Sequence, residues 1–327
     1  PAVRALPADL RTVLAAAALF GEVAWLGGVL AVLRGLRQDA TDSGSAADRS
    51  RLKAQLLQLM ALELVVFADD SRIEGDYEFR LASAAEGPSL FAAVAEETRR
   101  TMCRLAGQWL ATRRPAAELV LAARQAELCT AGGDLGRAAP AWLAAGTLAR
   151  AAGHQHRALA LFALGCACAS TDHAGVACDL RVALGGGLLR LSRHADAQTV
   201  LTEALHLARC ADDEERCGVV RLRLSQVARL LGDYERALDN LDAAHEHFGA
   251  LGAHRWISDV SDEVGRVHIA RGATDAYKTA LQHFLKALVL RRRGSDKNAV
   301  ARSLCQIARV HLCRGHLPDA GEALQEA

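Results

Sequence analysis

The stretch Leu231-Gly232-Asp233-Tyr234-Glu235-Arg236-Ala237-Leu238-Asp239-Asn240-Leu241-Asp242-Ala243-Ala244 decides how this chain folds. It predicts the end of one helix, a tight turn at Gly232, and a second helix with Ala237 and Ala244 seven residues apart. Since seven residues are close to two helical turns, both alanines lie on one helical face. A methyl group at each position lets a neighbouring helix approach closely, so we expect a packed helical hairpin.

The pair of small residues recurs along the chain. It is found again as Ala197 and Ala204, Ala280 and Ala287, Ala320 and Ala327, and in degraded form as Ala158 and Gly165. The first members stand at positions 158, 197, 237, 280 and 320, so the spacing is 39 to 43 residues. A nearly fixed period of this length is typical of repeat proteins.

Two more positions follow the same period. Gly153, Gly232 and Gly315 stand five residues before the alanine, where a helix end favours a left-handed residue. Twelve residues before it are small residues that would let two helices cross closely, provided that Ala273 to Asp275 loop out: Gly146, Gly185, Ser225, Gly265 and Ala308. The pattern resembles the tetratricopeptide repeat, with Trp142 at the first aromatic position and the long period of bacterial signalling variants.

The first third of the chain has a different pattern. It predicts helices at about 6–19, 25–35 and 51–63, then strands at 64–67 and 77–81, then helices at 89–95 and 96–111. Leu52, Leu56, Leu59 and Met60 are expected on one side of the third helix. Three helices followed by a β-hairpin are the plan of a winged helix.

We therefore predict an all-α fold, a right-handed α-solenoid of tetratricopeptide-like hairpins preceded by a small winged-helix domain with a β-hairpin. The expected domains are a winged-helix-like domain at 1–115, a linking helix at 116–134 and repeats at 135–327. The five expected hairpins are 135–169, 174–209, 215–250, 255–292 and 296–327. The short last hairpin should fray. This short hairpin and Pro1 in place of a start methionine indicate that the chain is a piece of a longer bacterial protein.

A second resemblance covers about residues 6–115. The matching pieces are Leu6-Pro7-x-x-Leu10-Arg11-x-x-Leu14, Phe20-Gly21-Glu22-x-x-Trp25, Glu63-Leu64-Val65, Asp70-Ser71-Arg72, Tyr77-x-Phe79-Arg80 and Arg104-Leu105-Ala106-Gly107-Gln108-Trp109-Leu110. In this order they resemble the region after the ATPase core of STAND signalling proteins, which are often joined to a Ser/Thr kinase. The resemblance implies that the ATPase and kinase domains precede this segment. Leu81 stands where the family commonly has a histidine near bound nucleotide, so we do not expect nucleotide sensing here.

Composition excludes several classes of protein. The 39 basic and 38 acidic residues leave a net charge of +1, so no bulk field attracts nucleic acid or an anionic membrane. The apolar run Leu14–Leu33 holds one charge, Glu22, but glycines interrupt it, and two buried helices explain it without a membrane span. Nine scattered cysteines indicate reduced thiols in the cytoplasm.

No catalytic, cofactor or metal motif is evident. The sequence has no Gly-Lys-Ser/Thr of a phosphate loop, no Gly-x-Ser-x-Gly and no His-Glu-x-x-His. His154 and His156, like His245 and His247, are two residues apart and point away from each other on a helix. We expect no enzyme activity, no cofactor and no metal site in this segment.

Binding is the better prospect. In the repeat family, the first helix of each hairpin lines the concave face at fixed offsets from its central small residue. Applied to this chain, these offsets select the partner-binding candidates Thr147, Arg150, Gln226, Arg229, Asp262, Arg266 and Arg309. Arginine forks suit carboxylate or phosphate groups. The alternative is that these arginines pair with Asp259, Asp262 and Glu263 along the same surface.

The function expected from these patterns is a non-catalytic sensor or regulatory segment that binds a protein or peptide in the repeat groove. Two alternatives stay open. One is a free-standing scaffold that only holds partners together. The other is a winged-helix transcription regulator that reads DNA with Arg49, Arg51 and Lys53 on its third helix, although three cations at a helix start are more typical of a solvated face.

Overall fold

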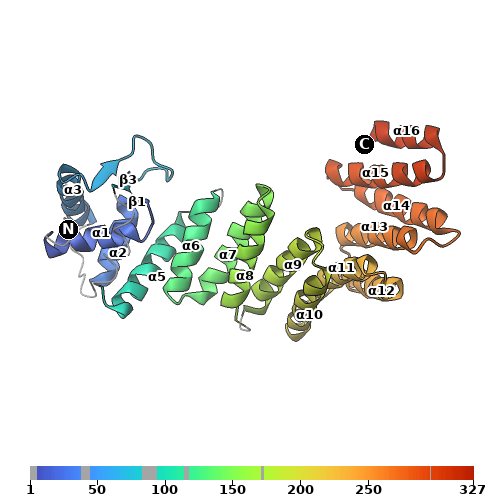
Figure 1. Ribbon diagram of the computed structural model, residues 1–327, viewed down its shortest axis with the longest axis horizontal. Helices are drawn as coiled ribbons and strands as arrows, with labels where there is room; N and C mark the ends of the chain where they lie inside the picture. Colours follow the sequence, from blue (N-terminus) through green and yellow to red (C-terminus); the bar gives the residue numbers. More distant parts are fainter. Residues whose placement is uncertain (1–5, 38–44, 83–93, 114–117, 171–172, 295) are drawn as a thin grey trace. The chain divides into compact units, whose positions relative to one another are not determined.

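The computed structural model describes residues 6–37, 45–82, 94–113, 118–170, 173–294 and 296–327. Contacts between residues divide the chain into two units, 1–170 and 171–327. In both units most of the described residues are helical, and helix follows helix along the chain with short turns between them (Figure 1).

The first unit begins with three helices and a small sheet. Their order is α1 (Ala8–Ala18), β1 (Val23–Trp25), α2 (Leu26–Leu36), α3 (Ser45–Ala61), β2 (Val65–Phe67) and β3 (Glu78–Leu81). The strands are antiparallel in the order β1-β3-β2, so the expected hairpin β2-β3 is present. The sequence did not indicate β1, a short strand that pairs Ala24 with Phe79. The third helix begins earlier than expected, and the helix expected at 89–95 lies largely outside the described residues.

An aromatic cluster forms the core of this region. The rings of Phe20, Trp25 and Trp109 lie 5.6 to 6.1 Å apart between centroids, and Trp109 comes from α5 (Glu96–Thr112). A Cβ at Gly28 would lie 2.7 Å from the Phe20 ring, so only glycine lets α2 approach this cluster. Leu52, Leu56 and Leu59 of α3 are buried, whereas Met60, expected on the same side of the helix, is 42% exposed.

Glu78 is a buried charge at the centre of the sheet. Its carboxylate accepts hydrogen bonds from Trp25 Nε1 at 3.1 Å and from the Arg72 backbone N–H at 2.8 Å, and pairs with the Arg72 guanidinium at 3.3 Å. A buried carboxylate is tolerated only when donors satisfy it in this way. The contacts tie the loop before β3 to β1.

The rest of the first unit is helical. After α5 come α6 (Leu119–Ala131), α7 (Leu135–Ala151) and α8 (Gln155–Cys168). Trp142 of α7 is buried and its Nε1 donates to Thr130 Oγ1 of α6 at 3.0 Å. A Cβ at Gly146 would lie 2.4 Å from the Phe162 ring, which explains how α7 and α8 come so close.

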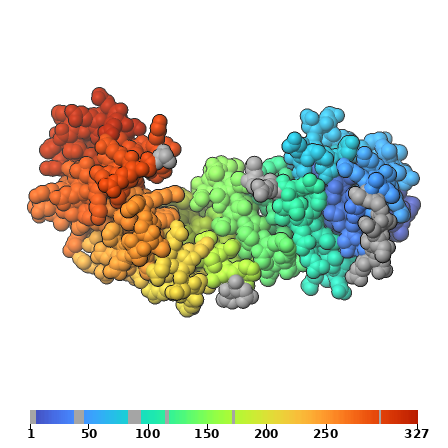
Figure 2. All heavy atoms as spheres, turned by 180° about the vertical axis from the view of Figure 1, so that it is seen from behind, coloured from blue at the N-terminus to red at the C-terminus, as the bar shows by residue number. Residues whose placement is uncertain are grey.

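The second unit consists of four helical hairpins. The helices are α9 (Ala174–Arg190), α10 (His194–Cys210), α11 (Glu214–Leu230), α12 (Tyr234–Ala250), α13 (His254–Arg271), α14 (Ala276–Arg292), α15 (Lys297–Cys313) and α16 (Leu317–Glu326). The atoms of α13 to α16 stack in sequence order from orange to red (Figure 2). With α7 and α8 of the first unit, these helices match the five hairpins that the period predicts.

The turns have the backbone that the repeat pattern predicts. Gly153, Gly232 and Gly315 have φ values of +83°, +82° and +77°, which confirms the left-handed positions. Ser192, at the same offset in its repeat, has a φ of +58°. Asp213, Asp233 and Asp296 cap the helices that follow them by accepting a backbone N–H three residues on.

Small residues lie where the hairpins are tightest. Ala197, Ala204, Ala237, Ala244, Ala280 and Ala287 are all 0% exposed, and Ala320 is 1% exposed. A Cβ at Gly185 would lie 2.7 Å from Leu201, and one at Gly265 would lie 2.7 Å from Phe284. The helices of each hairpin are therefore closer than a larger side chain permits.

None of the described helices combines the length and the apolar character that a membrane span needs. The apolar run Leu14–Leu33 is divided among α1, β1 and α2. None of the nine cysteines, all of which lie in the described residues, forms a disulfide bond.

Candidate functional site

Ion pairs join the first helices of neighbouring hairpins in the second unit. Asp179 of α9 accepts two hydrogen bonds from the Arg216 guanidinium of α11, each 2.9 Å long. Glu263 of α13 pairs with Arg229 of α11 at 2.6 Å. Because these contacts cross from one hairpin to the next, they fix the spacing of α9, α11 and α13 along one face.

Glu263 is the centre of this arrangement. Its side chain is 1% exposed, and its second oxygen accepts from Arg266 Nη1 at 3.3 Å. The two arginines are more open, with side chains 19% exposed at Arg229 and 34% at Arg266. One buried carboxylate therefore serves two guanidinium groups and leaves a net positive charge. The alternative stated above, that the candidate arginines pair with acids along the same surface, therefore holds for Arg229 and for Arg266.

Asp262 has a different environment from the other candidates. It is 4% exposed and pairs with Arg291 of α14 at 2.5 Å, and Arg291 also pairs with Asp259 at 2.6 Å and donates to Ser303 of α15 at 2.5 Å. Burial raises the pKa of Asp262, and the neighbouring guanidinium offsets only part of that effect. Asp262 thus lies in the packing between hairpins and is not open to a partner.

The remaining candidates are more accessible. Arg309 of α15 is exposed and forms no ion pair with any residue that the structure describes. Gln226 is half-buried and accepts from Arg223 at 3.1 Å. Thr147 and Arg150 are exposed on α7, which belongs to the first unit. We call Gln226, Arg229, Arg266 and Arg309 of the second unit, which the repeat offsets assign to one side, the arginine face.

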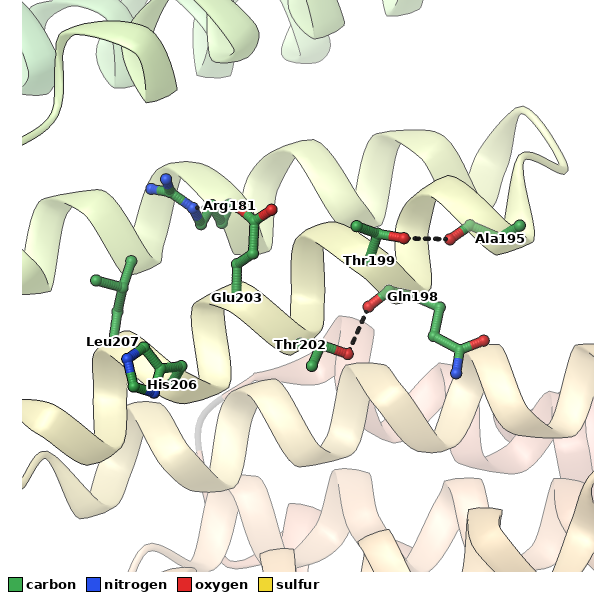
Figure 3. Close-up of a pocket in the computed structure, with 8 residues that line it drawn as sticks. All are labelled: Arg181, Ala195, Gln198, Thr199, Thr202, Glu203, His206 and Leu207. Atoms are coloured by element: carbon green, nitrogen blue, oxygen red, sulfur yellow. Dashed lines mark hydrogen bonds and ion pairs between the residues drawn. The ribbon is translucent and has the colours of Figure 1, made fainter.

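A hollow of about 850 Å³ lies along α10 (Figure 3). It is lined by Arg181, Ala195, Gln198, Thr199, Thr202, Glu203, His206 and Leu207. Arg181 reaches from α9 to Glu203 at 3.1 Å, while Thr199 and Thr202 donate to carbonyls one turn earlier in α10. Sequence reasoning missed this hollow, because all of its lining residues except Arg181 of α9 occupy ordinary outward positions of the second helix, α10.

Neither protein-family models nor curated proteins match the sequence. Solved structures match the fold. A Signal Transduction ATPase with Numerous Domains (STAND) protein with a tetratricopeptide repeat sensor, from Pyrococcus horikoshii, is 14% identical with a TM-score of 0.57, over 99% of this chain and 45% of its own. BtubC from P. vanneervenii is 15% identical with a TM-score of 0.46, over 71% and 89%. YrrB, a repeat protein with an unusual peptide-binding site, is 17% identical with a TM-score of 0.41, over 67% and 97%.

The fold is therefore that of a tetratricopeptide-repeat protein. Nearly all residues of this chain align with the STAND protein, but they cover only 45% of that protein's length.

Proposed function

We propose that this chain is a non-catalytic sensor and regulatory segment of a STAND-type signalling ATPase. The observation that carries the proposal is the alignment over 99% of the chain, which covers the small N-terminal region and the repeats in one order. The ATPase and any Ser/Thr kinase domain would belong to other parts of the same protein. Nine cysteines without a disulfide fit the reducing cytoplasm of a bacterium.

The N-terminal region, residues 1–115, would act as a winged helix. Its element order α1-β1-α2-α3-β2-β3 and the strand order β1-β3-β2, with the β2-β3 hairpin as the wing, support this assignment. With α6 as the linking helix of 116–134, it would transmit the state of the repeats at 135–327 to the ATPase. Leu81 at the end of β3 offers no group to a nucleotide, so the signal would pass through contact between domains.

The partner of the repeats would be a protein or peptide with carboxylate groups, bound at the arginine face. Arg309 is exposed and has no ion-pair partner among the described residues, and Arg266 has a 3.3 Å contact to Glu263. Guanidinium groups bind carboxylates through paired hydrogen bonds, which gives both strength and direction. Thr147 and Arg150, exposed on α7 of the first unit, would be a separate candidate surface.

The test compares protein capture from native cell extract by three forms of the chain. The variant Arg266→Gln/Arg309→Glu removes the charge at Arg266, where a glutamate would face buried Glu263, and reverses the charge at Arg309. Lys286→Glu makes one charge reversal on the exposed side of α14 as the control. Arg229 is left intact because a glutamate there would face buried Glu263. We expect a partner that the parent and the control retain and the double variant loses. Retention of the same proteins by all three forms would refute the arginine face.

The gene around this segment tests the STAND assignment separately. A phosphate-loop sequence within a few hundred residues upstream supports it, and its absence favours a free-standing scaffold. DNA reading is the less favoured alternative, because α3 exposes Leu57 and Met60 as well as its three cations. Exposed apolar side chains suit a protein contact better than phosphate.

A further inference from the structure

Three metal-ligating side chains gather in the last hairpin. His311 is in the last turn of α15, His316 precedes α16, and Asp319 is in the first turn of α16. One ligand atom of each lies within 4.8 Å of the others. The Nδ1 atoms of His311 and His316 are 3.5 Å and 3.4 Å from the same carboxylate oxygen of Asp319.

These distances fit a shared ion better than direct hydrogen bonds. An N–H···O hydrogen bond is about 2.7–3.2 Å long, shorter than both contacts. Two ligands bound at about 2.0–2.1 Å to a tetrahedral ion are about 3.4 Å apart, which matches them. Moreover, Nδ1 of His311 is buried and has no hydrogen-bond partner among the described residues. A buried ring nitrogen without a partner is costly unless something binds it.

We propose that His311, His316 and Asp319 bind one divalent transition-metal ion of the zinc class. Two imidazoles and one carboxylate suit zinc, cobalt or nickel, whereas magnesium and calcium prefer oxygen ligands alone. The ion links the end of α15 to the start of α16 and keeps its fourth position open to water. Asp319 supplies a negative charge that offsets the positive end of the helix. The site is independent of the arginine face and of the STAND assignment.

Cobalt(II) is the probe, because tetrahedral cobalt absorbs visible light and thiolate ligands add a separate near-ultraviolet band. The full chain is titrated with the ion, beside His316→Ala and Asp319→Asn. Both changed side chains are about half exposed, so the variants should fold, and circular dichroism checks this. The matched control is His245→Ala, an exposed histidine on α12.

We expect one equivalent of cobalt to saturate the visible bands of the parent and of the control, without the thiolate band. Loss of a residue that only supports a metal ligand lowers metal affinity roughly 10- to 100-fold. In the two variants, which each lose a ligand, the affinity for cobalt should fall by at least this much. The proposal is overturned if no saturable visible band forms, if the variants bind as the parent does, or if the thiolate band shows that cysteines hold the ion.

Discussion

Replacing Glu263 with alanine should loosen the contact between the second and third hairpins of the second unit. The change removes the buried carboxylate that pairs with Arg229 and Arg266 and leaves both guanidinium groups without it. Breaking a fully buried ion pair costs about 3–5 kcal/mol. The arginine side chains are 19% and 34% exposed, so water recovers part of this. We therefore reduce the value for a fully buried pair and expect the free energy of unfolding to fall by about 2 kcal/mol.

Hydrogen exchange measured by mass spectrometry suits this test, because a chain with two units need not unfold in one step. A loss of about 2 kcal/mol corresponds to roughly 30-fold faster exchange in peptides from α11 and α13. The control is Glu203→Ala, which breaks the pair with Arg181 at a side chain that is 57% exposed and should cost under about 1 kcal/mol. Exchange in α11 and α13 that changes no more than in the control would refute the central role of Glu263.

Three further predictions follow from the packing, the thiols and the histidines. Gly185→Leu should destabilise α9 and α10 by about 1–3 kcal/mol, because even a Cβ would lie 2.7 Å from Leu201. Gly249→Ala on α12, where a Cβ meets nothing within 4 Å, should instead gain up to about 1 kcal/mol, and hydrogen exchange measures both. In the folded protein a thiol reagent should rapidly modify the three exposed cysteines, Cys210, Cys305 and Cys313, and in denaturant it should modify all nine. Buried thiols should react slowly, because burial raises the pKa of Cys129 to about 11 and of Cys178 to about 12. Burial lowers the pKa of the stacked imidazoles of His268 and His283, so the unfolded chain binds more protons than the folded chain as the pH falls. The melting temperature Tm should therefore decrease when the pH is lowered from about 7 to about 5, and it should decrease less in the variant His268→Gln/His283→Gln.

The repeat could be predicted because its signals are local. The left-handed turn at Gly232 and the aspartate cap at Asp233 depend on neighbouring residues only, and a left-handed residue recurs at the turn of each hairpin. Sequence spacing therefore predicts the hairpins to within a few residues. The exposure of Met60 could not be predicted, because a helical period alone does not say where the buried face ends.

The rest depends on contacts between distant residues. Strand β1 exists because β3, more than fifty positions later, offers it a partner. Arg291 reaches Asp262 and Asp259 from the neighbouring helix, and nothing near it in the sequence marks that role. The metal cluster spans a helix end and a turn, whereas the histidine pairs that sequence reasoning tested were two residues apart. Only the fold brings such groups together.

The charge pattern also limits how the arginine face can bind. Arg229 is committed to Glu263 by a 2.6 Å contact, while Arg266 holds the same carboxylate at 3.3 Å. A partner carboxylate would therefore bind Arg309 without competition and draw Arg266 away from Glu263 before it could affect Arg229. The ion pair of Arg229 and Glu263 joins neighbouring hairpins. Binding of a carboxylate at Arg309 and Arg266 would leave this ion pair intact. Under the proposed function, the face would recognise an acidic partner without giving up the ion pair that holds α11 against α13.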